Sequence, residues 1–87
     1  MDIMEQIRIL EQNRDEIQKV DLELVELLNY RMRLCESIMK LKRNNGKKLY
    51  APIVEAEKIE FLSCYSEFEG MVEAIWPVMM CYARTLS

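Results

Sequence analysis

Hydrophobic residues recur along the first half of the chain at the spacing of one helical face. The most regular positions are Leu10, Ile17, Leu24, Leu28, Cys35 and Ile38. Their steps of three, four and seven residues are typical of an amphipathic helix. No Gly or Pro occurs between Asp2 and Lys42. The pattern therefore predicts one uninterrupted helix of about 40 residues, roughly 60 Å long.

A polar turn and a second helix follow. The turn spans residues 43–48 and contains Gly46, which favours the end of a helix. Pro52 suits the first position of a new helix because its missing N–H has no helical partner there. The pattern predicts that this helix runs to about Cys64.

A third helix is expected near the C-terminus. Ser66 is followed three residues later by Glu69, which is the spacing of a capping box. We therefore expect a helix from about Glu67 to Thr85, with Pro77 inside it. The predicted fold is all-α, with one very long helix and two shorter ones in a single domain of residues 1–87.

The predicted first helix is too long for a monomer of this size. A chain of 87 residues makes a domain of marginal stability. Half of a helix roughly 60 Å long would have nothing in its own chain to pack on. Because 51% of the residues are hydrophobic, we expect association. A second copy is the simplest partner, so the sequence predicts a helical homodimer.

Composition excludes several classes of function. The net charge of −3 argues against nucleic acid as a partner. The chain has no histidine, which removes histidine-based metal sites and a base for a catalytic thiol. Cys35, Cys64 and Cys81 are widely spaced and odd in number, as expected for thiols in a reducing cytoplasm. We expect no signal peptide and no membrane span, since no long apolar run occurs.

Three cations interrupt the apolar stripe of the first helix. On a wheel of about 100° per residue, Arg31 and Lys42 fall within the stripe and Arg14 at its edge. A cation on a core-facing surface is costly unless an anion meets it. One interpretation is a pocket for a small dicarboxylate, which arginine binds through paired hydrogen bonds. The other is that these side chains extend to solvent or pair with glutamates.

Three segments of the chain resemble a known family. The first helix carries Arg14, Val20-Asp21, Leu27-Leu28, Arg31 and Lys42 at the family's spacings. The stretch Leu49–Glu55 matches the family's segment of a hydrophobic residue followed by D-P-x-R-E. Val72–Trp76 matches a segment of the family's third helix. The chain thus resembles the all-helical (AroQ-class) chorismate mutases over nearly its whole length.

The resemblance implies a fold, a reaction and site residues. It implies an intertwined homodimer that rearranges chorismate to prephenate, a step of phenylalanine and tyrosine biosynthesis, without a cofactor or metal. Arg14 from the partner chain and Arg31 would bind the two carboxylates. Lys42 would donate to the ether oxygen, where negative charge develops, and Glu55 would accept from the substrate hydroxyl. Without the family, Glu55 is equally an ordinary acid in the first turn of a helix.

The chain departs from the family at four polar positions. Where the family has Asp and Arg, this chain has Ala51 and Val54. Ala83 replaces the family's third-helix Ser, and Ser87 replaces its Gln or Glu, the second donor to the ether oxygen. Ala51 and Ser87 therefore occupy substrate-binding positions without the usual side chains. Loss of the second donor to the ether oxygen would lower the rate by roughly 10²–10³.

Three functions stay open. The leading hypothesis is a chorismate mutase with a reduced set of contacts, because Arg14, Arg31 and Lys42 are all retained. The second is a binding or regulatory module of the same fold without catalysis. The third is an elimination of pyruvate from isochorismate. Related lyases share the Arg, Arg, Lys set, but they lack an equivalent of Glu55.

Overall fold

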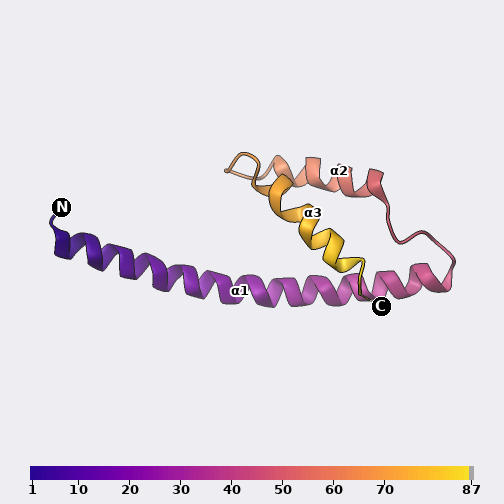
Figure 1. Cartoon of the computed structure of the whole chain (residues 1–87), viewed down its shortest axis with the longest axis horizontal. Helices are drawn as coiled ribbons and strands as arrows, with labels where there is room; N and C mark the ends of the chain where they lie inside the picture. Colours follow the sequence, from indigo (N-terminus) through magenta and orange to yellow (C-terminus); the bar gives the residue numbers. More distant parts are fainter. Residues whose placement is uncertain (87) are drawn as a thin grey trace. The chain divides into compact units, whose positions relative to one another are not determined.

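The computed structural model describes residues 1–86, and all regular secondary structure in that range is helical. It contains α1 (Ile3–Asn44), α2 (Pro52–Ser63) and α3 (Met71–Ala83), with no strand in the part of the chain described (Figure 1). The predicted all-α fold of one very long and two shorter helices is confirmed. The first helix ends two residues later than expected, and the second begins at Pro52 as predicted.

The structure divides inside α1 into two compact units, Met1–Arg31 and Met32–Ser87. The first unit is a single stretch of helix. Its N-terminus is capped by Asp2, whose Oδ1 accepts a 2.7 Å hydrogen bond from the backbone N–H of Glu5. Its apolar stripe is uncovered, with Ile17 58% and Leu24 49% exposed. Within this unit, a single helix, no other element packs on the stripe.

The second unit contains a helical hairpin of α2 and α3, which lie side by side (Figure 1). Ser63 at the end of α2 bonds to Glu73 at the start of α3. Glu55 at the start of α2 bonds to Arg84 at the end of α3. These two ties show that the helices run antiparallel. The buried side chains of the described residues all belong to this unit: Met39, Val72, Met80 and Ala83.

The start of α2 has no side-chain cap. Ala51 holds the N-cap position with φ −126° and ψ 80°, and it forms no capping hydrogen bond. Pro52 follows at the first helical position, where its ring fixes a helical φ and costs no hydrogen bond. Proline therefore sets the beginning of α2, and the capping interaction that an aspartate would add is missing.

The start of α3 differs from the prediction. The helix begins at Met71 instead of near Glu67, and Gly70 is its N-cap with φ 78°. The hydroxyl of Ser66 accepts from the backbone N–H of Phe68 and lies 2.8 Å from its carbonyl oxygen. Ser66 thus stabilises a local turn, which competes with capping. Gly70 then reverses the chain in a left-handed conformation that glycine adopts without strain.

Residues 1–86 contain neither a membrane-spanning helix nor a metal-binding cluster. No helix within residues 1–86 is long and apolar enough to cross a membrane. Nor does any group of three His, Cys, Asp or Glu residues in this range lie close enough together to hold a metal ion.

Candidate functional site

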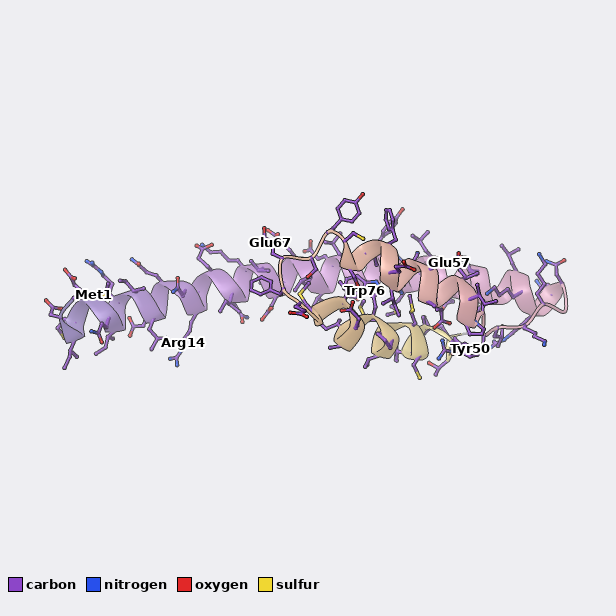
Figure 2. The ribbon with its side chains drawn as sticks, turned by 90° about the horizontal axis from the view of Figure 1, so that it is seen from above. Met1, Arg14, Tyr50, Glu57, Glu67 and Trp76 are labelled. Atoms are coloured by element: carbon purple, nitrogen blue, oxygen red, sulfur yellow. The ribbon has the colours of Figure 1, made fainter. Side chains whose placement is uncertain are left out.

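Arg14 and Arg31 both lie in the first unit, on one unbroken length of α1. Arg14 is exposed, and Figure 2 shows its side chain extending away from the ribbon. Arg31 is half-buried. Since the two are separated by about five helical turns, they lie roughly 25 Å apart along the axis. One small dicarboxylate is far too short to bridge them within a single chain.

Lys42 and Glu55 lie in the second unit. Lys42 is in the last turn of α1 and is half-buried. Its backbone carbonyl accepts a 2.8 Å hydrogen bond from the N–H of Lys47, which closes the turn after the helix. Lys40, only two residues earlier, is exposed, and its Nζ lies 3.7 Å from Oε1 of Glu36. The two lysines therefore have different surroundings despite their closeness in sequence.

Glu55 meets an arginine that the sequence analysis did not identify. Nη1 of Arg84 donates to Oε1 of Glu55 at 2.7 Å and to Oε2 at 2.6 Å. Both side chains are half-buried, at 23% exposed for Glu55 and 26% for Arg84. Hydrogen bonds in which both partners are ionised are among the strongest in proteins. Glu55 is thus held by the end of α3 as well as by its own helix.

The guanidinium of Arg84 also lies over an aromatic ring. Its central carbon is 4.4 Å from the centroid of the Tyr50 ring, within the range of a cation–π interaction. The hydrogen bond to Glu55, reinforced by the charge of that carboxylate, raises the pKa of Arg84 above its already high ordinary value. The residue is therefore a fixed positive charge.

The remaining positions of the predicted site carry no polar side chain where the structure describes them. Ala51 is half-buried at the start of α2, and Val54 is 62% exposed. Ala83 is buried, at 5% exposed. Ser87, which we predicted at a substrate-binding position, lies outside the described residues.

Arg84 was missed because its role depends on the pairing of two helices. It lies 29 residues from Glu55, so no helical periodicity connects them. The signal that identifies it is the antiparallel register of the hairpin, which places the residue after α3 against the first turn of α2. That register requires the true start of α3, which the sequence analysis placed too early.

The fold is all-helical, and three of the cations on its long first helix, Arg14, Arg31 and Lys42, lie on or at the edge of the apolar stripe. A sequence model of the family described as chorismate mutase type II matches residues 13–86. Since this match covers most of the chain, the protein belongs to the type II chorismate mutase family, and the resemblance noted from its motifs is confirmed. No curated protein sequence matches the chain.

Proposed function

We propose that this protein is a chorismate mutase that converts chorismate to prephenate with a reduced set of polar contacts. The observation that carries the proposal is the retention of Arg14, Arg31 and Lys42 on α1, within the range matched by the family. The reaction is a rearrangement within one molecule, so it needs no nucleophile or metal. Catalysis then consists of holding the reactive conformation and stabilising the charge that develops.

Each charged residue has a distinct role in this proposal. Arg14 and Arg31 bind the two carboxylates of the substrate, because guanidinium groups match carboxylate geometry. Lys42 donates to the ether oxygen as the carbon–oxygen bond breaks and the new carbon–carbon bond forms. Glu55 accepts from the ring hydroxyl and fixes the orientation of the ring. Ala51 stands at a substrate-binding position and supplies no polar anchor. Ser87, the other such position, lies outside the described residues.

The proposed site requires two chains. Arg14 and Arg31 lie roughly 25 Å apart on one helix, so the Arg14 of each site comes from a second copy. The exposed stripe of α1, which includes Ile17 and Leu24, supplies an apolar surface for that copy. We propose an intertwined homodimer in which the whole chain, residues 1–87, acts as one domain. Three cysteine thiols without a disulfide fit a reducing cytoplasm.

A binding module without turnover is the second candidate. The observation that favours it is that Ala51, Val54 and Ala83 provide no polar side chain where the family has one. Such a module would bind chorismate or a similar dicarboxylate and transmit that binding to another protein.

The test is the loss of chorismate absorbance with the purified protein, with prephenate identified as the product. Lys42→Ala should lower kcat/KM by about 10² or more, since the proposed donor to the ether oxygen is lost. Lys40→Ala is the matched control, because Lys40 is exposed and pairs with Glu36, and it should retain full activity.

The products also separate the candidates. Prephenate formation that disappears in Lys42→Ala supports the mutase. Chorismate binding without turnover would favour the binding module and overturn the mutase. Salicylate and pyruvate formed from isochorismate would instead indicate the lyase reaction.

A further inference from the structure

We propose that Arg84 is a positioning residue of this site, which holds the Glu55 carboxylate in the orientation that receives the substrate hydroxyl. The inference rests on the proposed function and extends it to a residue outside the motifs of the family. Arg84 follows the last residue of α3, whereas the other proposed site residues of the described chain lie on α1 or at the start of α2.

The geometry of the pair restricts the carboxylate. A single nitrogen, Nη1 of Arg84, donates to both oxygens of Glu55, at 2.7 Å and 2.6 Å. Rotation of the carboxylate about its terminal bond would lengthen one of these two hydrogen bonds. Because both side chains are half-buried, water competes less well for these groups than it would at an exposed ion pair.

Arg84 is itself held on a second side. Its guanidinium stacks over the Tyr50 ring at 4.4 Å, and Tyr50 lies just before the start of α2. The arginine is thus fixed between the ring of Tyr50 and the carboxylate of Glu55. A donor that is already immobilised orients its acceptor at a lower entropic cost than a mobile side chain would.

The carboxylate retains capacity for a ligand. An ionised carboxylate has about four acceptor sites, and Arg84 uses one on each oxygen. Remaining acceptor sites are available to a hydroxyl. Val54 brings no charge beside Glu55 from α2, and Arg84 brings a cation to this carboxylate from α3. Arg84 therefore supplies the positive charge that meets the Glu55 carboxylate in this hairpin.

If the Glu55–Arg84 pair had a purely structural role, loss of another tie between α2 and α3 would raise KM in the same way. The pair also ties the start of α2 to the end of α3, so its loss loosens one end of the hairpin. Ser63 and Glu73 tie the other end, far along the helices from Glu55. Ser63→Ala is therefore a matched control that removes a tie between the same two helices without touching Glu55.

The experiment compares Arg84→Gln, Glu55→Gln, the double variant and Ser63→Ala in the full chain. Chorismate turnover is measured first, and chorismate binding is measured by calorimetry in parallel. A hydroxyl contact made in both the ground and transition states affects KM more than kcat. We expect Arg84→Gln and Glu55→Gln each to raise KM about tenfold, with kcat changed by less than about twofold.

The double variant distinguishes action through Glu55 from an independent effect. If Arg84 acts through Glu55, the double variant is no worse than Glu55→Gln alone. Ser63→Ala should change KM by less than about twofold. Arg84→Lys, which keeps the charge, should give a smaller rise in KM and serves as the test if Arg84→Gln does not fold. Unchanged KM in the Arg84 variants, or effects that add fully in the double variant, would overturn the proposal.

The binding arm separates this inference from the proposed function. If the protein binds chorismate without turning it over, the mutase proposal fails. A positioning role is still supported if Arg84→Gln and Glu55→Gln each raise the dissociation constant and the double variant is no worse than Glu55→Gln. If the dissociation constants do not follow the pattern, Arg84 has no such role. A protein that neither binds nor converts chorismate contradicts both proposals.

Discussion

Ser63, the last residue of α2, donates a hydrogen bond from its hydroxyl to Oε1 of Glu73 in the first turn of α3. This hydrogen bond, with a smaller contribution from the backbone N–H of Glu73 itself, lowers the pKa of the Glu73 carboxyl below its ordinary value of 4.5. The ionised carboxylate therefore stabilises the hairpin at the end opposite to Glu55 and Arg84.

The lowered pKa of Glu73 predicts how the stability of the protein depends on pH. Because the folded-state pKa lies below the unfolded value of 4.5, the unfolded chain binds the proton more readily. The stabilisation by Glu73 is fully present above that value and is lost as the pH falls through the folded-state pKa. We expect urea unfolding to show a steeper loss of stability below pH 4.5 in the wild type than in Glu73→Gln. Equal slopes in the two proteins would contradict this assignment.

The exposed stripe of α1 predicts a dimer that a single charge weakens. Leu24 is 49% exposed in the isolated chain and lies on the face proposed to meet the second copy. Leu24→Asp buries a carboxylate there and should weaken dimerisation by at least about 100-fold. Sedimentation equilibrium measures the change. Glu26→Ala, on the opposite side of the helix, is the control and should remain dimeric; dissociation of both variants alike would refute the assignment of this face.

The uncapped start of α2 predicts a stabilising substitution. Ala51 holds the N-cap position without a capping hydrogen bond. Ala51→Asp supplies an acceptor for an unpaired N–H of the first turn and should raise the free energy of unfolding by about 1 kcal/mol. Thermal unfolding at neutral pH measures it. Ala56→Asp introduces the same side chain in the middle of α2 and should not stabilise; a gain at both positions would show that capping is not the cause.

The sequence predicts α1 well, because its apolar spacing is regular and no glycine or proline interrupts it. It predicts the start of α2 for an equally local reason, the fixed φ of Pro52. It places the start of α3 wrongly, since the pattern of Ser66 and Glu69 is compatible with either a cap or a turn. Only the three-dimensional structure shows that Ser66 contacts Phe68 and that Gly70 is the N-cap of a helix that begins at Met71.

Some residues of the candidate site can likewise be predicted from the sequence, and others only from the structure. Arg14, Arg31 and Lys42 are recognisable because cations are unexpected on an apolar face, and the family match includes all three. Arg84 is not recognisable, because its pairing with Glu55 follows from the register of α2 against α3. The pairing of Arg14 with a second chain follows from helix length and stays a prediction.

The most direct test of the central claim, a mutase site shared between two chains, mixes two inactive variants. Arg14→Ala and Lys42→Ala each remove both sites of their own homodimers. In a heterodimer, one site regains the intact Arg14 of the Lys42→Ala chain and the intact Lys42 of the Arg14→Ala chain. Since half of the dimers in an equal, fully exchanged mixture are heterodimers, about a quarter of the wild-type chorismate mutase activity should return.

The control mixes Arg31→Ala with Lys42→Ala. Arg31 and Lys42 serve a site from the same chain in this account, so no site in that mixture is complete and activity should stay at background. Recovery with Arg14→Ala and none with Arg31→Ala is the predicted result. No recovery in the first mixture, after exchange of chains has been verified, would contradict a site that takes Arg14 from one chain and Lys42 from the other.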